Sequence, residues 1–155
     1  MERVIVDSVT EYTDLQYIKN INAGNKFDAI EELAKLFDGT NLCNDIDSLI
    51  NALKEREAIM STGIGASIAI PHAKISTVNR MAFAIGVSKK GIDFDSMDGN
   101  DVNLIILVIA GEKQHKDYLR LLSNIMTILK REPIKEKIIH AASSEEILNI
   151  LKEQA

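Results

Sequence analysis

Two apolar stretches decide the fold of this sequence: Met81-Ala-Phe-Ala-Ile-Gly-Val87 and Val102-Asn-Leu-Ile-Ile-Leu-Val-Ile109. Each is a nearly continuous run of hydrophobic residues and is rich in branched side chains. Runs of this kind are typical of strands that are covered on both faces. The longest wholly apolar segment, Leu104 to Ala110, is far too short to span a bilayer. We therefore expect two buried central strands and no direct insertion into a membrane.

Shorter signals on either side of these runs predict further strands and turns. Residues 2–6, with Val4 and Val6 on one side, predict a short edge strand. The segment from Ile68 to Ile70 predicts a strand that stops at Pro71, because proline has no amide hydrogen to donate. Between the two central runs, Gly91–Phe94 predicts a short exposed strand and Asp98–Asn100 predicts a turn.

Apolar residues at helical spacing predict helices before, between and after the strands. The expected stripes are Ile30, Leu33, Ala34 and Phe37; Ile46, Leu49, Ile50 and Leu53; and Leu119, Leu122, Ile125, Met126 and Leu129. Asn44 or Asp45 can cap the second helix, which should end near Glu57. Pro133 suits the first turn of a later helix, and Ser143 begins a capping box for the last one.

This order of elements predicts the fold class. Helices that precede, interleave with and follow buried strands indicate an α/β fold, a mixed β-sheet sandwiched between helices. A chain of 155 residues without linkers or low-complexity tracts predicts a single domain that spans residues 1–155.

The composition excludes several function classes. The formal net charge is −5 and no basic stretch with interleaved aromatics occurs, so we expect no nucleic-acid partner. One cysteine, Cys43, excludes an internal disulfide. The first residues lack the regions of a signal peptide, which predicts a cytoplasmic protein.

His72 is the residue around which the chemistry concentrates. It follows Pro71 at the predicted strand end, and Gly63 and Gly65 lie just before that strand. We expect the two glycines to form a bent loop whose amides can face an anion. A neutral imidazole at this place could accept a phosphoryl group, transfer a proton or bind a metal.

Motifs for the competing kinds of site are absent from the sequence. There is no HxH, HxxxH or HExxH pattern, and His72, His115 and His140 are far apart. The Gly-x-Ser-x-Gly elbow of a catalytic triad is missing. The pair Gly63 and Gly65 lacks the third glycine of a dinucleotide fingerprint and precedes a strand, and no Gly-Lys-Ser/Thr loop exists. We therefore expect no metal and no cofactor.

The stretch Met60-Ser61-Thr62-Gly63-Ile64-Gly65, followed by Ile68-Ala69-Ile70-Pro71-His72-Ala73, resembles a family signature. It is similar to that of the fructose/mannitol/nitrogen-type enzyme IIA domains of the bacterial phosphoenolpyruvate-dependent sugar phosphotransferase system. The order of helices around the signature is also similar, so the resemblance covers about residues 24–155.

The resemblance implies a phosphocarrier that acts through His72. A IIA component of this kind takes a phosphoryl group on the signature histidine from the histidine-containing phosphocarrier protein. It then passes the group to a cysteine or histidine of a IIB component, which serves sugar uptake. Nitrogen-type relatives instead use their phosphorylation state as a regulatory signal, and the sequence leaves both roles open, as it does the sugar.

The resemblance also implies companions for His72. Arg56 lies at the spacing where the family commonly carries an arginine near the phosphoryl site. Many members have a second histidine at the start of a later helix. Here Tyr118 aligns with that histidine and His115 lies one turn earlier, so either could be the second group. Apolar residues around His72, namely Met60, Ile64, Ile68 and Ile75, would form a docking rim or would instead seal the strand end against the core, and the sequence leaves both open.

Overall fold

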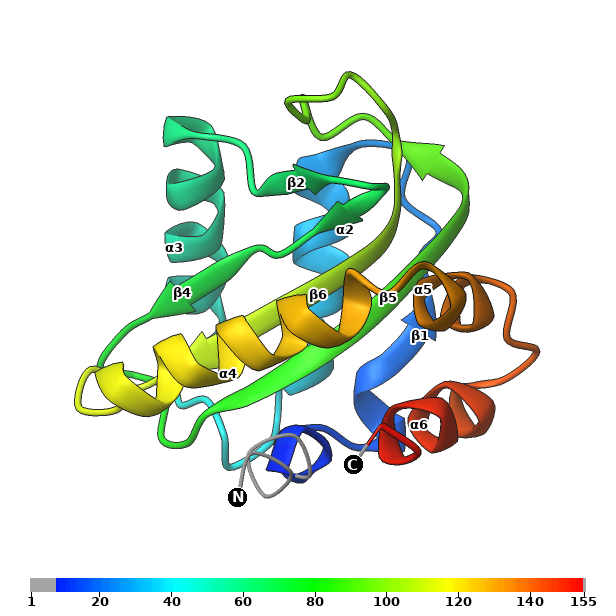
Figure 1. Ribbon diagram of the computed structural model, residues 1–155. Coiled ribbons are helices and arrows are strands. Elements are labelled where there is room, and N and C mark those ends of the chain that lie inside the picture. The colour runs from blue at the N-terminus through cyan, green and yellow to red at the C-terminus, as the bar shows by residue number, and fades with distance from the viewer. Residues whose placement is uncertain (1–7, 155) are drawn as a thin grey trace.

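The computed structural model describes residues 8–154, and the predicted strand at residues 2–6 lies outside this range. Two long strands form the centre of the molecule, β5 (Ala82–Ile92) and β6 (Val102–Ala110). They pair antiparallel, from Ala82 opposite Ile109 to Ile92 opposite Val102. Figure 1 shows them crossing the middle of the molecule. The two apolar runs are thus confirmed as the central strands.

Shorter strands extend the pair into a mixed sheet. They are β1 (Ile18–Asn20), β2 (Gly63–Gly65), β3 (Ile68–Ala69) and β4 (His72–Lys74). The strand order is β1-β5-β6-β3-β2, and β4 also pairs with β6, beyond the end of β3. β1 is parallel to β5, while β3 and β4 are both parallel to β6. The edge of β6 therefore carries one interrupted strand, with residues 70 and 71 at the break.

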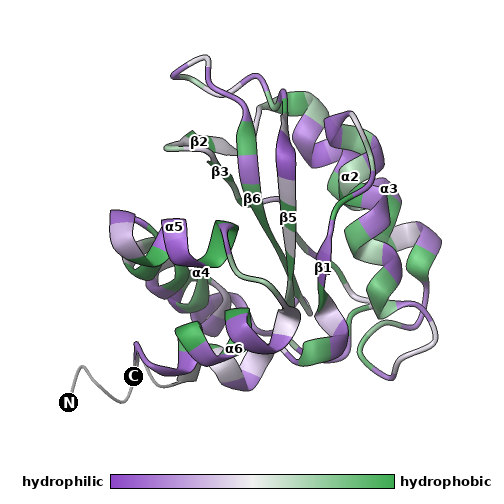
Figure 2. Ribbon diagram, turned by 90° about the vertical axis from the view of Figure 1, so that its right-hand side faces the viewer, coloured by the Kyte–Doolittle hydropathy of each residue, from purple (hydrophilic) through white to green (hydrophobic). Residues whose placement is uncertain are grey.

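Helices cover both faces of this sheet, as Figure 2 shows. One layer contains α2 (Lys26–Ala34), η3 (Lys35–Phe37) and α3 (Ile46–Ile59). The other contains α4 (His115–Leu129), α5 (Glu132–Ile139) and α6 (Ser144–Lys152), with the short 3-10 helices η1 (Ser8–Tyr12) and η2 (Leu15–Tyr17) near its edge. The predicted α/β class, a mixed sheet between helical layers in one domain, is confirmed.

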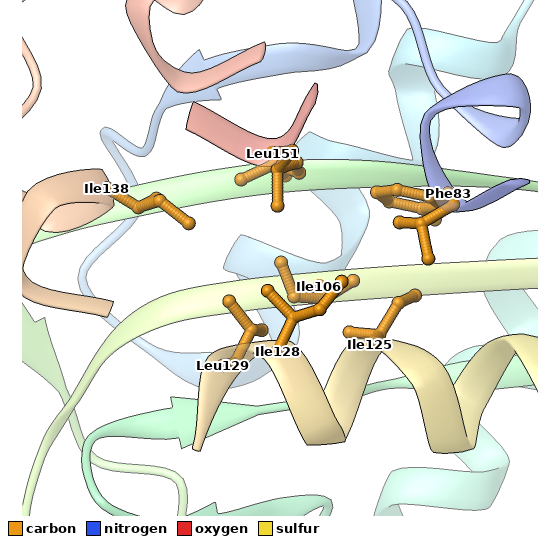
Figure 3. A pocket seen from close by; sticks show the side chains of 9 residues that line it. Phe83, Ile106, Ile125, Ile128, Leu129, Ile138 and Leu151 are labelled. Atoms are coloured by element: carbon orange, nitrogen blue, oxygen red, sulfur yellow. The ribbon is translucent and has the colours of Figure 1, made fainter. Parts of the chain in front are cut away.

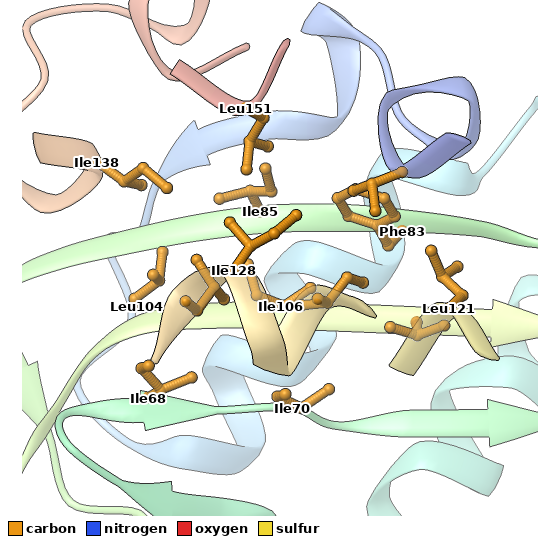
Figure 4. Close-up of a cluster of buried hydrophobic side chains, with 14 of the residues drawn as sticks. Ile68, Ile70, Phe83, Ile85, Leu104, Ile106, Leu121, Ile128, Ile138 and Leu151 are labelled. Atoms are coloured by element: carbon orange, nitrogen blue, oxygen red, sulfur yellow. The ribbon is translucent and has the colours of Figure 1, made fainter. Parts of the chain in front are cut away.

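Strand β6 explains why the central sequences are almost wholly apolar. Successive strand side chains point to opposite faces, and both faces are covered. Leu104 and Ile106 join the core under α4, α5 and α6, which Figure 4 shows in close-up. Ile105 and Leu107 join the core under α2 and α3. From Leu104 to Ala110 every residue of this strand is therefore buried and apolar.

The helix ends largely follow the predicted signals. Asp45 is the N-cap of α3 and accepts a bond from the Ser48 amide. Ser143 caps α6 in the same way through the Glu146 amide, and Pro133 lies in the first turn of α5. None of the helices within residues 8–154 is long and apolar enough to cross a bilayer.

Two of the local predictions need correction. Gly91–Phe94 is not a separate exposed strand, because β5 continues to Ile92 and the Phe94 side chain is fully buried. In α4, Leu119 is 52% exposed, while Tyr118 and Leu121 face the core. Ile125 and Leu129 of the predicted stripe are buried as expected. The α4 sequence is apolar on more than one side, however, so spacing alone chose Leu119 where Tyr118 and Leu121 face the core.

A small apolar cavity remains between the central strands and the helices α4–α6 (Figure 3). Its volume is about 10 Å³ and its lining includes Phe83, Ile106 and Ile128. A space of this size is at the limit for one water molecule, and a water needs polar partners to stay there. The apolar lining offers none, so we regard the cavity as a packing gap.

Candidate functional site

His72 is the first residue of β4, directly after the break in the strand. The pairing of β3 ends at Ala69, and the Val108 amide then donates to the Pro71 carbonyl over 2.9 Å. Pairing with β6 resumes with His72 opposite Val108. The predicted stop before Pro71 is confirmed. A second strand segment begins directly after it, however, and holds the His72 backbone firmly in the sheet.

One ring nitrogen of His72 is occupied and the other is free. Nδ1 lies 2.8 Å from the Ile70 carbonyl oxygen. A carbonyl oxygen can only accept, so Nδ1 carries the hydrogen, and in the neutral tautomer the lone pair is then on Nε2. The His72 side chain is half-buried, and this bond fixes the ring with Nε2 as its nucleophilic atom.

Tyr118, in the first turns of α4, packs beside the His72 ring. The two ring centroids are 5.9 Å apart and the planes are tilted by 57°. Burial raises the pKa of the Tyr118 hydroxyl, and the nearby positive charge of Arg56 lowers it by less. The hydroxyl therefore stays protonated far above neutral pH.

Arg56 reaches the same place from the last turn of α3. Its Nη1 donates to the Met60 carbonyl over 2.8 Å, which satisfies one free acceptor beyond the helix end. The guanidinium carries further N–H groups in a planar fork. Its charge acts on the Tyr118 hydroxyl, so α3, β4 and α4 bring Arg56, His72 and Tyr118 together.

His115 is the first residue of α4 and lies against Lys74, not against His72. The Lys74 Nζ is 2.8 Å from His115 Nδ1. A lysine ammonium can only donate, so Nδ1 of His115 is the acceptor in this contact. His115 is exposed. The pair adds one positive charge two residues along β4 from His72.

A buried carboxylate, Glu57, fixes the end of α3 beside this site. It is 2% exposed and accepts bonds from the Thr62 amide at 3.0 Å and the Thr62 hydroxyl at 2.5 Å. Lys26 lies 3.4 Å away and supplies the opposite charge. Because Arg56 is the adjacent residue, this bonding also fixes the backbone position from which the Arg56 side chain extends. The role of Glu57 was not predicted from the sequence, because its partners lie outside its own helix.

The glycine segment differs from the expected anion-binding loop. Gly63–Gly65 is strand β2 and forms a hairpin with β3, whose turn holds Ala66 and Ser67 at φ of 56° and 65°. Its amides have internal acceptors: Gly63 N donates to the Ser61 hydroxyl at 3.0 Å and Ala66 N to Asp98 at 3.0 Å. These amides are not available to an anion.

Exposed apolar side chains occur just after the active-site turn of α3, in β2 and in the first turns of α4. They are Ile59, Met60, Ile64 and Leu119, with exposures of 81%, 67%, 41% and 52%. Of the predicted docking rim, Met60 and Ile64 are indeed exposed. Ile68 is fully buried in the core instead, and Ile75 packs against the core under α2 and α3.

The fold and this site define a class, a small α/β domain that presents one histidine nitrogen at the surface beside an arginine. The chain belongs to the family described as "Phosphoenolpyruvate-dependent sugar phosphotransferase system, EIIA 2", whose model matches residues 12–154. The family resemblance inferred from the signature around His72 is thereby confirmed.

Curated relatives carry two kinds of name. The chain is 36% identical over 146 residues to the fructose-specific EIIABC component of Bacillus subtilis, matching 94% of this chain but 23% of that protein. It is 35% identical to the fructose-specific EIIA component of Haloferax volcanii, matching 81% of each. A nitrogen regulatory protein of Pseudomonas aeruginosa is 29% identical over 132 residues, which are 85% of this chain and 86% of that protein.

Solved structures agree with the fold. The nitrogen regulatory protein IIA-Ntr from Neisseria meningitidis superimposes with a TM-score of 0.86 at 27% identity, covering 92% of this chain and 98% of that one. The complex of enzyme IIA and phosphorylated enzyme IIB for mannitol from Escherichia coli matches with a TM-score of 0.77 at 20% identity, covering 91% and 99%. At that identity the second match supports the fold alone.

Proposed function

We propose that this protein is a IIA phosphocarrier that accepts a phosphoryl group on Nε2 of His72 from the histidine-containing phosphocarrier protein and passes it to a IIB component for sugar uptake. The observation that carries the proposal is the bond from His72 Nδ1 to the Ile70 carbonyl at 2.8 Å. In the neutral ring, this bond places the hydrogen on Nδ1 and the nucleophilic lone pair on Nε2.

The transfer step balances with the groups present. The Nε2 lone pair attacks phosphorus as the bond from phosphorus to the donor's histidine nitrogen breaks, and that nitrogen keeps the electron pair and takes a proton from water. The His72 ring becomes positively charged, and its Nδ1–H group still donates to the Ile70 carbonyl oxygen. In the second transfer, the group leaves Nε2 for the cysteine or histidine of the IIB component.

Arg56 stabilises the phosphoryl oxygens in this proposal. The work of the protein in such a transfer is mainly positioning and charge stabilisation. Only one Arg56 nitrogen bonds to Met60, so the other N–H groups can meet phosphate oxygens, and a planar guanidinium suits that geometry. The His115–Lys74 pair, bonded at 2.8 Å, adds positive potential farther from the phosphoryl group.

The exposed apolar side chains support a role for this surface in transient docking. Ile59 and Met60 directly follow the Arg56 turn, and Leu119 directly follows Tyr118. A phosphoryl donor and acceptor must each approach Nε2 closely and then leave. A modest apolar rim beside charged groups fits such short-lived complexes.

The experiment that tests the proposal is phosphorylation in a reconstituted relay. Wild-type protein incubated with phosphoenolpyruvate, enzyme I and the phosphocarrier protein should acquire one acid-labile phosphate. His72→Gln should acquire none, whereas His140→Gln, a change at an exposed histidine that ends α5, should behave as the wild type. Phosphate on the His72→Gln variant would refute the assignment.

A regulatory role is the second candidate, and the high structural similarity to a nitrogen regulatory protein favours it. In that role the phosphohistidine would signal the state of the relay to partner proteins. Two observations separate the candidates. Neighbouring genes for IIB and IIC components, and rapid passage of phosphate to such a IIB protein, support transport. A nitrogen sigma factor setting, and no passage to IIB, support regulation.

A further inference from the structure

We propose that this protein has a second binding site, a polar pocket at the start of β5 that takes a free α-amino acid in its zwitterionic form. The pocket has a volume of about 250 Å³, below the range of sites for drug-sized ligands, so it suits a small metabolite. The inference goes beyond the proposed function and does not depend on it. Neither the family description nor the names of the relatives assign a ligand to this place.

The pocket lies where three parts of the chain meet at one corner of the sheet. Its walls come from residues within 11–17, from the loop after η3 at residues 41 and 42, and from residues 80–82 at the start of β5. β1 pairs with β5 on this side, whereas β4 pairs with β6 on the other side of β5. In Figure 1 the blue N-terminal residues and the cyan loop meet the start of β5 at the lower end of the molecule. Two strands therefore separate the pocket from His72.

Thr13 places an unpaired hydroxyl in this pocket. Its Oγ1 is buried, and within residues 8–154 it has no hydrogen-bond partner. A buried hydroxyl without a partner destabilises the folded state, so most such groups in proteins are bonded. Because Thr13 lines the pocket, a ligand there can accept a bond from this hydroxyl or donate one to it. The free protein thus holds a polar group that a ligand would satisfy.

Charged side chains of both signs line the same pocket without pairing with one another. Arg80 contributes a guanidinium, and Glu11 and Asp14 contribute carboxylates. Asp14 accepts a bond of 2.8 Å from the Leu15 amide. In the part of the chain that the structure describes, the Arg80 guanidinium and the Glu11 carboxylate have no ion pair and no hydrogen bond. All three charged residues are exposed, so their charges lie nearer the mouth than the buried Thr13 hydroxyl.

A small zwitterion matches this arrangement better than an ion of one sign. A simple anion would bind Arg80 but would be repelled by the two carboxylates, and a simple cation would meet the reverse. A free α-amino acid carries a carboxylate and an ammonium group on one carbon. The carboxylate can bind the guanidinium in a bidentate way, and the ammonium can donate to the side chains of Glu11 and Asp14. Thr13 and the amide of Gln16, which also lines the pocket, offer further hydrogen bonds.

The test is a titration of the ¹⁵N-labelled full chain, followed by amide chemical shifts. Each of the standard L-amino acids is added up to about 10 mM, a range that detects weak binding. For any that binds, the α-carboxamide and the analogue without the amino group are titrated beside it, with D-glucose as a neutral polar probe. Arg80→Gln and Thr13→Val are compared with Arg131→Gln, a change at an exposed arginine before α5.

We expect at least one amino acid to shift the amides of Thr13, Gln16 and Arg80, with a dissociation constant of about 1 mM or lower. Both of its single-charge analogues should bind about tenfold more weakly or worse, as should Arg80→Gln, because each loses a charge-assisted hydrogen bond. Arg131→Gln should bind as the wild type. Thr13→Val should bind more weakly yet melt at or above the wild-type temperature, because it removes a buried hydroxyl that has no partner in the free protein.

The inference is overturned if none of the amino acids shifts these amides. Equal binding of the single-charge analogues, or of glucose, would also overturn it, because the site would then not recognise a zwitterion. A lower melting temperature of Thr13→Val with unchanged affinity would give the hydroxyl a structural role and contradict the assignment. His72→Gln should bind the amino acid as the wild type does, so failure of phosphotransfer and failure of this site are told apart.

Discussion

The β2–β3 hairpin and the His72 site lie on one continuous stretch of chain, yet they treat their polar groups in opposite ways. In the hairpin, the Ala66 amide donates to Asp98, and the Ala66 carbonyl accepts a hydrogen bond of 2.9 Å from the buried Lys135. At the site, Nε2 of His72, the hydroxyl of Tyr118 and most of the Arg56 N–H groups keep unused bonding capacity. The hairpin is a closed network and the site is an open one.

The difference separates structural from functional chemistry within one sequence motif. A turn with Ala66 and Ser67 at positive φ is strained for residues with a side chain. Its internal hydrogen bonds offset that cost. Around His72 the backbone is ordinary paired strand, and the unused groups belong to side chains. Changes in the hairpin should therefore alter stability, and changes at the site should alter phosphotransfer.

Arg56 should show the largest effect of a single charge at the site. Arg56→Ala removes the cation that meets the phosphoryl oxygens, so the rate of phosphorylation should fall by roughly tenfold to a hundredfold. Arg56→Lys should recover part of the rate, because the charge returns without the planar fork. The rate is measured in the reconstituted relay, with the exposed Arg131, at the far end of α4, changed to alanine as control. A normal phosphorylation rate in Arg56→Ala would show that Arg56 only bonds the Met60 carbonyl at the end of α3.

Lys135 tests the other half of the comparison. Its side chain is 4% exposed and holds the Ala66 carbonyl, with Glu132 at 2.6 Å. Lys135→Met keeps the length of the side chain but leaves that carbonyl without its donor, so unfolding should require about 1–3 kcal/mol less free energy. Urea denaturation measures the change. Phosphotransfer by the folded variant should stay within twofold of wild type, and a selective loss of transfer would contradict the division.

His115 should matter less than Arg56. It contacts Lys74 and is exposed, so it acts on the phosphoryl group only through the potential of that lysine. We expect His115→Ala to slow phosphorylation by about threefold or less, since exposed charges are well screened. An effect as large as that of Arg56→Ala would mean that His115 contacts the phosphoryl group directly.

The smallest effect concerns the hairpin at low pH. Hydrogen bonds from the Asn100 and Ala66 amides hold the pKa of Asp98 below its usual value. Because the folded pKa is depressed, the stabilisation is present above the unfolded pKa of about 3.9 and is lost as the pH falls through the folded value. Melting temperatures of wild type and Asp98→Asn should therefore differ at pH 6 and converge toward pH 2. A constant gap across this range would refute the linkage.

The parts of the fold that depend on local signals were predictable. The central strands follow from two apolar runs, and the caps at Asp45 and Ser143 from single residues that bond to amides three positions later. The core face of the first turns of α4 was not predictable from spacing, because Tyr118, Leu119, Leu121 and Leu122 are all large and hydrophobic. Only the packing partner decides which of them face the core.

His72 and Arg56 were predictable from the sequence, but the residues that position them were not. His72 stands out through Pro71 and the signature, and Arg56 through the family spacing. The resumption of the strand at His72 depends on Val108, and the position of the α3 end depends on Glu57 with Thr62 and Lys26. Those partners are separated in the chain and carry no local pattern. The same holds for the choice between Tyr118 and His115.

The most direct measurement is the identity of the phosphorylated atom. After phosphorylation by the relay, phosphorus and nitrogen NMR distinguish a histidine modified at Nε2 from one modified at Nδ1, and peptide mapping gives its position. The Nδ1 bond to the Ile70 carbonyl predicts a single phosphohistidine at His72, modified at Nε2. Phosphate on Nδ1 of His72, or on any other residue, would contradict the account.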